Sequence, residues 1–322
     1  MDNYSEPGSD AQSLLNQIVL EYMRDKKRAR MWRYLKRGVL LLIACVILYM
    51  FYELRHDASV TLNKPHVGLI DLKGEIFDNN SASADYFIRG LNAAYKNKSM
   101  RGLIIRIDSP GGSPVQADYM YQAIKQYSLK NSDIKIIAVC VDACASAAYY
   151  VASAAQDIYA NPSSLVGSIG VLYNGFGFVD ALQKLGVSRR LQTSGKNKGF
   201  LDPFLAENPA QVVMLQKMLD LIHQEFIDKV KAGRGSRLKI DDDTFSGLFW
   251  TGIQAKERGL IDGFASSGQV AREIFKLDKV VDYTYEPNVL EKLAGRVGTS
   301  LANQLPMALG LKPRIELAIK HP

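Results

Sequence analysis

The sequence predicts an α/β protein built on parallel strands and preceded by a single membrane-spanning helix. Three observations support this prediction: apolar runs end at turn residues, helical stretches separate them, and a charge-free run follows a basic N-terminal segment. Strands that are buried on both faces have continuous apolar sequences, and helices usually connect them in parallel sheets. The chain has 322 residues, 47 % of them hydrophobic, which is enough for a sizeable core.

The N-terminal segment has the pattern of a membrane anchor. Eight of the basic residues lie between residues 24 and 37, and the next 15 residues, Gly38–Tyr52, carry no charge. Basic residues beside an apolar run indicate membrane topology, with the basic side in the cytoplasm. We therefore expect a cytoplasmic basic segment at 1–37, a transmembrane signal anchor at 38–54 and a linker at 55–65.

This topology decides what the net charge of +7 means. The basic cluster is needed on the cytoplasmic side of the anchor, so we expect no nucleic-acid partner. A cleaved signal peptide is the alternative, but the basic region starts late and no small-x-small cleavage site follows Tyr52. The sequence after the anchor is therefore expected to be exported.

The strands are predicted by short, uninterrupted apolar runs. The first is VGLIDL at 67–72, the second is GLIIRI at 102–107, which stops at DSPGGS, and the third is IKIIAVCV at 134–141. A fourth, shorter strand followed by a turn is predicted in DIYANPSS at 157–164. Runs of this length that end at Gly, Pro or Ser are typical of buried strands.

Helices are predicted between and after these strands. SADYFIRGLNAAY at 83–95 and VQADYMYQAIKQY at 115–127 have helical spacing, and SAAYYVASAA at 146–155 is a run of small residues. The longest helix, at 209–235, repeats apolar residues at helical spacing and ends at a glycine. GIQAKERGLIDG at 252–263 is a further helical stretch that ends in glycine.

The remaining features set the domain limits and exclude some chemistry. No internal repeat is visible, so we expect one catalytic domain at 66–290 and a C-terminal tail at 291–322. Cys140 and Cys144 lie in an apolar strand and are expected to be buried free thiols, because residues four apart on an extended segment are too distant for a disulfide. The spacing of Cys and His predicts no metal site, and we expect no cofactor.

Ser146 stands where the third strand meets the small-residue helix, and by itself such a serine is a helix cap. A Ser-His-Asp triad is not expected, and the Gly-x-Ser-x-Gly pattern is absent. The histidines lie beside the anchor, at the first strand, inside the long helix and next to the end of the chain: His56, His66, His223 and His321. A lysine whose pKa is lowered by desolvation is the other base that can activate a serine.

Two further stretches fit such a site. IDSPGGSP at 107–114 ends a strand, and its glycines permit positive φ angles that expose backbone N–H groups to an oxyanion. TSGKNKGFLDPF at 193–204 is a polar loop that carries lysines. Each alone is typical of an ordinary turn or loop, and only their order around Ser146 indicates a catalytic site.

Five ordered motifs resemble the signal peptide peptidase A (SppA) family in its short, single-anchor form. They are DSPGG, ASAAYYVASAA, LVGSIGV, TSGKNKGFLDPF and GIQAKERGLIDG, over about residues 66–275. The resemblance implies a ClpP/crotonase-like spiral fold and a Ser-Lys dyad, with Ser146 as the nucleophile. The general base falls on Lys198, five residues before Pro203, with Lys196 as the neighbouring alternative.

The resemblance also implies how the oxyanion is held. Its donors are the amide of Gly111 or Gly112 and that of Ala147, which follows the nucleophile. The family usually has Ser-Gly-Gly-Tyr-Tyr at this place, whereas this chain has alanines at 147 and 148. Alanine suits the first turn of a helix better than glycine, so the change is tolerable if these positions are helical.

The expected function is that of a serine endopeptidase in the bacterial inner membrane, with its catalytic domain on the periplasmic or extracytoplasmic side. Family members cleave remnant signal peptides and assemble into homo-oligomeric rings, with active sites shared between subunits. Two alternatives stay open from the residues. One is a crotonase-like acyl-CoA hydratase or hydrolase, and the other is an inactive, ring-forming membrane scaffold that binds peptides.

Overall fold

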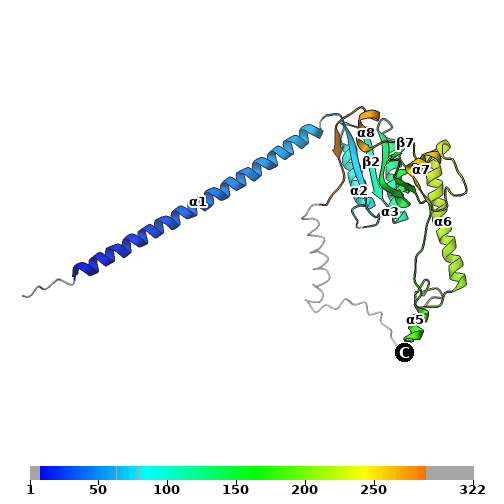
Figure 1. The fold of residues 1–322 in the computed structure, drawn as a ribbon, viewed down its shortest axis with the longest axis horizontal. Coiled ribbons are helices and arrows are strands. Elements are labelled where there is room, and N and C mark those ends of the chain that lie inside the picture. Colours follow the sequence, from blue (N-terminus) through cyan, green and yellow to red (C-terminus); the bar gives the residue numbers. More distant parts are fainter. Residues whose placement is uncertain (1–7, 63, 79, 288–322) are drawn as a thin grey trace, which may run out of the picture. The chain divides into compact units, whose positions relative to one another are not determined.

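The computed structural model describes residues 8–62, 64–78 and 80–287 (Figure 1). The chain divides into two compact units, residues 1–64 and 65–322. The tail predicted at 291–322 lies outside the described residues.

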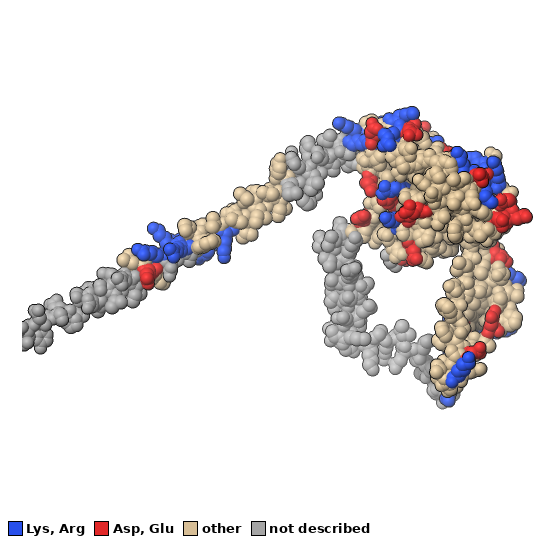
Figure 2. Space-filling model, in the orientation of Figure 1, with Lys and Arg blue, Asp and Glu red and all other residues tan. Residues whose placement is uncertain are grey.

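The first unit contains one long helix, α1 (Gly8–Leu62). Lys and Arg gather on one stretch of it, next to an uncharged stretch (Figure 2). Among the residues that the structure describes, no helix is both long and apolar enough to cross a membrane. The anchor predicted at 38–54 is therefore not confirmed, and the side chains of residues 50–54 lie outside the described residues. The segment predicted as a linker, 55–65, is helical as far as Leu62.

The second unit is built on an eight-stranded sheet in the order β6-β5-β3-β2-β1-β8, with β4 paired to β3 and β7 paired to β4. Every described strand pair is parallel except β5 with β6, so the predicted α/β class is confirmed. The bounds are β1 (His66–Lys73), β2 (Met100–Ser109), β3 (Lys135–Ala145), β4 (Asp157–Ala160), β5 (Leu165–Gly167), β6 (Phe249–Thr251), β7 (Gly263–Phe264) and β8 (Val280–Asp282).

Helices connect and cover these strands. They are α2 (Ala84–Lys96), α3 (Pro114–Lys130), α4 (Ala147–Ala152), α5 (Val179–Lys184), α6 (Pro209–Arg234), α7 (Gly252–Glu257) and α8 (Ser267–Gln269), with short 3-10 and π turns at Gly235–Arg237 and Val270–Ile274. The long predicted helix is confirmed as α6, which ends before Gly235 at a φ of 56°. That glycine permits the left-handed turn that stops the helix.

The core lies on both faces of the central strands. Ile104 and Ile105 are adjacent on β2, point to opposite faces and are both fully buried, each in a different apolar cluster. All six residues of α4 are buried, and the Tyr149 hydroxyl donates to the Leu260 carbonyl at 2.7 Å. Small side chains let α4 pack this closely, which fixes the segment that begins next to Ser146.

Strand β3 is irregular just before the serine. Ile107 pairs with Cys140 and Ser109 pairs with Cys144, so β3 advances four residues where β2 advances two. β3 pairs with β4 before this irregularity and with β5 after it. Cys140 and Cys144 are buried and free, as predicted, and the register of β3 against β2 shifts between them.

Residues 171–208, called the arm below, leave the sheet and include α5 (Figure 1). In the described chain, the hydrogen bonds of residues 171–207 all end on other residues of the arm. For example, the Phe178 amide donates to Pro203, and Arg189 pairs with Asp202. Helix α6 then returns the chain to the core, where Phe226 and Val230 are buried.

Candidate active site

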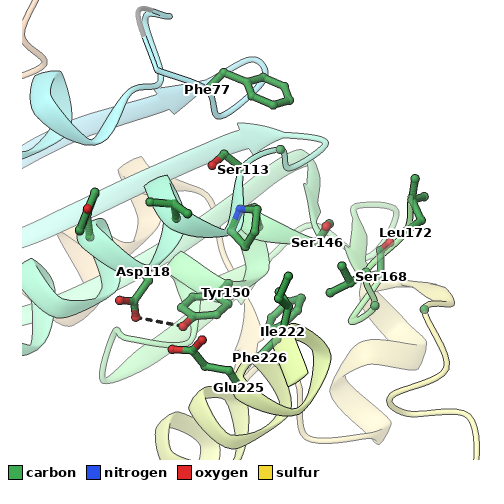
Figure 3. Close-up of a pocket in the computed structure, with 18 of the residues that line it drawn as sticks. Phe77, Ser113, Asp118, Ser146, Tyr150, Ser168, Leu172, Ile222, Glu225 and Phe226 are labelled. Atoms are coloured by element: carbon green, nitrogen blue, oxygen red, sulfur yellow. Dashed lines mark hydrogen bonds between the residues drawn. The ribbon is translucent and has the colours of Figure 1, made fainter. Parts of the chain in front are cut away.

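A cavity of about 1090 Å³ opens beside the end of β3 (Figure 3). Its walls come from the segment after β1, the β2–α3 turn, α3, α4, the chain after β5, α6 and the loop before β6. The lining residues are Phe77, Gly112, Ser113, Pro114, Val115, Asp118, Tyr119, Ser146, Ala147, Tyr150, Ser168, Gly170, Val171, Leu172, Ile222, Glu225, Phe226, Ser246 and Gly247.

Ser146 lies in this cavity with a backbone conformation that few residues other than glycine adopt. Its φ is 53° and its ψ is −127°. Its amide donates to the Gly167 carbonyl at 2.7 Å, and its carbonyl accepts from Tyr150 at 3.0 Å. The side chain makes no capping hydrogen bond to α4. A strained residue held by its neighbours at a strand end, with a hydroxyl not used for capping, has the features of a positioned nucleophile rather than a helix cap.

The glycine turn after β2 packs directly against the serine. A Cβ atom on Gly111 would lie 2.7 Å from the Ser146 Cβ, and one on Gly112 would lie 2.2 Å from the Ile76 carbonyl oxygen. The φ angles are 107° and 148°, which favour glycine. The turn is held by the Ile76 amide, which donates to Gly111, and by the Ser113 amide, which donates to Ile76.

The structure distinguishes the candidate oxyanion donors. The Gly111 amide donates to the Ser109 hydroxyl at 3.2 Å, so it is occupied. Within the described part of the chain, no hydrogen-bond acceptor is recorded for the amides of Gly112 and Ala147, and both residues line the cavity with Ser146. These two amides are therefore the better placed pair for an oxyanion.

The two alanines after Ser146 are accommodated by the fold. Ala147 and Ala148 are the first residues of α4 and are 4 % and 0 % exposed. Their helical conformation meets the condition under which alanine can replace glycine here. The sequence difference therefore leaves the strand–serine–helix geometry intact.

Lys198 is not brought to Ser146 within the single chain. It lies on the arm, is exposed, and is absent from the residues that line the cavity; the same holds for Lys196. Its amide donates to Gly195 within the same turn. A lysine acts as a base only in closed, desolvated surroundings, which this exposed loop does not supply.

The far end of the cavity is polar. The Asp118 carboxylate accepts from the Tyr150 hydroxyl at 3.0 Å (Figure 3). It also accepts from the Lys229 ammonium at 3.0 Å. Burial alone raises the pKa of Asp118, but the hydrogen bonds from Lys229 and Tyr150 outweigh it and hold this pKa below its ordinary value. Asp118 is therefore ionised at neutral pH. Glu225 adds a second carboxylate to this wall.

Some residues of the cavity were not found from the sequence. Ser168 has a φ of 51° and lines the cavity with Ser146; it lies within the motif LVGSIGV, but no role was predicted for it. Asp118 and Glu225 carried no signal, because α3 and α6 meet only in the folded chain. The histidines whose side chains are described take no part in the cavity: His66 contacts the Tyr283 hydroxyl, and His223 contacts the Ile169 carbonyl.

Comparisons with known proteins match this site. Residues 128–281 match the model of peptidase family S49. A 190-residue segment is 42 % identical to a Brucella abortus protein named Na(+)/H(+) antiporter NhaA, over 59 % of this chain and 26 % of that protein. The putative protease slr0021 of Synechocystis is 35 % identical over 52 % of this chain and 59 % of that protein. A putative signal peptide peptidase SppA of Enterococcus faecium is 26 % identical over 76 % of this chain and 71 % of that protein.

These comparisons show similarity to peptidases over the segment that carries Ser146. The segment that matches the family includes Ser146 and α4. Over residues 128–281 the chain is similar to peptidase family S49, and its relatives include a protein named as a putative SppA. It spans only about a quarter of the Brucella protein and about three fifths of the Synechocystis protein. The antiporter name belongs to a protein most of which lies outside the match.

Proposed function

We propose that this protein is a membrane-bound serine endopeptidase that degrades remnant signal peptides with a Ser146–Lys198 dyad. The observation that carries the proposal is Ser146 itself, strained and uncapped, beside the amides of Gly112 and Ala147. The family match and the relatives named proteases favour peptide substrates over acyl-CoA substrates. The mainly parallel sheet and the short helix after β3 are compatible with the ClpP/crotonase-like spiral that the motifs imply.

In the proposed reaction, neutral Lys198 removes the Ser146 hydroxyl proton while Oγ attacks the peptide carbonyl carbon. The amides of Gly112 and Ala147 hold the resulting oxyanion. When the C–N bond breaks, the protonated lysine gives its proton to the leaving amine, and water then hydrolyses the acyl-enzyme in a second cycle. The cavity beside Ser146 supplies room for substrate side chains.

We propose further that the dyad is completed between subunits of a ring. Lys198 is exposed on the arm, and the arm also exposes large apolar side chains: Leu172, Phe176 and Leu185. Covering such a surface with a second copy would place the lysine in the closed, desolvated surroundings that a lysine base needs. For localisation, the charge-free run at 38–52 after the basic cluster supports an anchor in the bacterial inner membrane, with the catalytic domain on the extracytoplasmic side.

Hydrolysis of a denatured protein by the purified full chain tests the dyad. We expect Ser146→Ala and Lys198→Ala each to reduce the rate at least about 10³-fold. Lys196→Ala is the matched control and should change the rate less than threefold. A large loss for Lys196→Ala with none for Lys198→Ala would move the base to residue 196, and hydrolysis that survives both Ser146→Ala and Lys198→Ala would refute the dyad.

Mixing two inactive variants tests the shared site. If the base comes from a neighbouring subunit, Ser146→Ala chains supply the lysine and Lys198→Ala chains supply the serine, so co-refolded mixtures recover part of the wild-type rate. If both residues act within one chain, every chain in the mixture lacks one of them and the rate stays at background. The serine itself is checked by labelling with a fluorophosphonate, which Ser146→Ala should abolish.

A further inference from the structure

The end of the cavity away from Ser146 is negatively charged. Its lining includes two carboxylates, Asp118 from α3 and Glu225 from α6, and no lysine or arginine. Figure 3 shows both carboxylates near the Tyr150 hydroxyl, on the side of Tyr150 away from Ser146. A pocket that binds only apolar groups rarely contains two carboxylates in its wall, because an unpaired charge is costly to bury.

The neighbouring groups do not neutralise this charge. Lys229 lies 3.0 Å from the Asp118 carboxylate and 4.0 Å from that of Glu225, so one ammonium serves two carboxylates. Lys229 is also held over the Tyr121 ring, 5.0 Å from its centroid, outside the lining of the cavity. Asp118, Glu225 and Lys229 together carry one formal negative charge, and Glu225, whose side chain is 57 % exposed, is accessible to a substrate.

The route from Ser146 to these carboxylates is apolar. Tyr150 lies four residues after Ser146 on α4, which is about 6 Å along a helix, and its hydroxyl donates to Asp118. Ile222 and Phe226 of α6 line the same stretch (Figure 3). A side chain with a hydrocarbon stem and a cationic tip matches this sequence of surfaces, because the stem packs on the apolar wall while the charge reaches the carboxylates.

We propose that this end of the cavity is a specificity pocket for a lysine or arginine side chain of the substrate, on the acyl side of the cleaved bond. Glu225 receives the cationic tip, and Asp118, held by Lys229 and Tyr150, adds to the negative field. The proposal rests on the proposed peptidase function and names its substrate class. Signal peptides carry basic residues next to an apolar segment, so they offer cleavage sites of this kind.

The test is a set of quenched fluorescent peptides that differ at one position, cleaved by the full chain. The residue on the acyl side is lysine, norleucine or glutamate, and a fourth peptide has lysine on the leaving side. We expect kcat/KM for lysine to exceed that for norleucine about tenfold, equivalent to about 1.4 kcal/mol. The ratio should fall as salt is added, because the attraction is between charges. Equal or faster cleavage of the norleucine peptide, or preference only for leaving-side lysine, would overturn the proposal.

Three variants assign the preference to residues. Glu225→Gln should reduce the lysine-to-norleucine ratio to about twofold or less. Lys229→Met should raise the ratio, because it removes the cation that competes with the substrate. Asp228→Asn is the matched control: it removes an exposed carboxylate from the same helix, outside the cavity lining, and should leave the ratio unchanged. A ratio that falls equally in Asp228→Asn would show that net charge, not this pocket, produces the preference.

A binding measurement separates this proposal from the proposed dyad. Fluorescence anisotropy of the same peptides on Ser146→Ala protein reports the pocket without any catalysis. We expect the lysine peptide to bind about tenfold more tightly than the norleucine peptide, and Glu225→Gln to remove this difference. This result would support the pocket even if the wild type cleaved no peptide. A failure to cleave would count against the dyad alone. Equal binding of lysine and norleucine peptides would refute the pocket whatever the rate of hydrolysis.

Discussion

The core of the second unit and the arm at 171–208 differ in the exposure of their apolar side chains, which are buried in the core and exposed on the arm. Around Ser146 the packing is tight, since Gly111 has no room for a methyl group and Ala147 is 4 % exposed. On the arm, Leu172, Phe176 and Leu185 are 80 %, 74 % and 75 % exposed. Ser146 is therefore fixed by the folding of a single chain, whereas Lys198 on the arm is exposed.

Helix α6 shows the same contrast within one element. Phe226 and Val230, in its C-terminal half, are buried against the core, whereas Val213, Met214 and Leu221, in its N-terminal half, are 55 %, 55 % and 73 % exposed. Its apolar residues continue at helical spacing through both halves. A core helix thus extends beyond the part of the core that the described residues cover, and the arm joins it at that end.

The largest expected effect of a core variant on stability concerns a buried ion pair. Arg234 is 1 % exposed and donates to both Asp262 oxygens, at 2.8 and 2.9 Å, and to the Gly259 carbonyl at 2.8 Å. Arg234→Met leaves the Asp262 charge without this partner, so we expect the free energy of unfolding to fall by about 3–5 kcal/mol in urea titrations at pH 7.

The matched variant on the arm is Arg189→Met, which removes an arginine paired with Asp202. We expect it to leave the urea midpoint unchanged. Equal destabilisation by the two variants would show that the arm is as much a part of the folding unit as the core, and the contrast between them would fail.

The core pair also predicts a response to acid. Burial raises the pKa of Asp262, but the hydrogen bonds from Arg234 and the Ile158 amide outweigh it and leave this pKa below its ordinary 3.8. A carboxyl with a lower pKa in the folded state stabilises the fold above its unfolded pKa, and that contribution is lost as the pH falls through the folded value. Wild-type stability should therefore drop more steeply than that of Asp262→Asn below about pH 4.

Substituting one glycine in each region tests how much each region contributes to the rate of hydrolysis. Gly112→Ala places a methyl group 2.2 Å from the Ile76 carbonyl oxygen and strains a φ of 148°, so the turn must move its amide. We expect hydrolysis to fall about 10²- to 10³-fold, as when one oxyanion donor is lost. Gly177→Ala, on the arm, meets nothing within 4 Å and should change the rate less than twofold.

A different result would change the assignment of the oxyanion site. If Gly112→Ala keeps its rate while its thermal midpoint falls, the turn is structural and the Gly112 amide is not a donor. Burst kinetics with an activated ester separate these cases, because a displaced donor slows acylation even when the protein remains folded.

The sequence predicted the parts of the fold that depend on local pattern. The strands at 67–72 and 102–107 lie within β1 and β2, because continuous apolar runs mark strands that are buried on both faces. The short strands β6, β7 and β8 were missed, since two or three residues carry no recognisable period. The irregularity in β3 was missed because a register shift is decided by the neighbouring strand.

Some features of the candidate site could be predicted from the sequence, and others depend on contacts that form only in the folded chain. Ser146 and the glycine turn stand at ends of predicted strands, where parallel strands bring their carboxyl ends to one edge of the sheet, so their meeting could be expected. Which glycine amide is free depends on the Ser109 hydroxyl, and no spacing in the sequence indicates that contact. The carboxylates of Asp118 and Glu225 share a wall only because α6 folds back onto the core.

The smallest expected effect on the stability of the single chain comes from the apolar surface of the arm. Phe176 is 74 % exposed and contacts Phe178 with ring centroids 6.4 Å apart. Phe176→Ser removes little buried area, so we expect the free energy of unfolding to change by less than about 0.5 kcal/mol. If the arm is covered by a second copy, as proposed, the same variant should shift the sedimentation profile toward the monomer.

Leu129→Ser is the control, because Leu129 is 84 % exposed at the end of α3, on the core. It removes a similar apolar side chain, so it should alter neither the unfolding free energy nor the sedimentation profile. If both variants leave assembly unchanged, the exposed residues of the arm do not form the subunit contact. If Phe176→Ser dissociates the assembly and abolishes both hydrolysis and fluorophosphonate labelling while the unfolding free energy is unchanged, then Ser146 becomes reactive only when a second copy supplies the base.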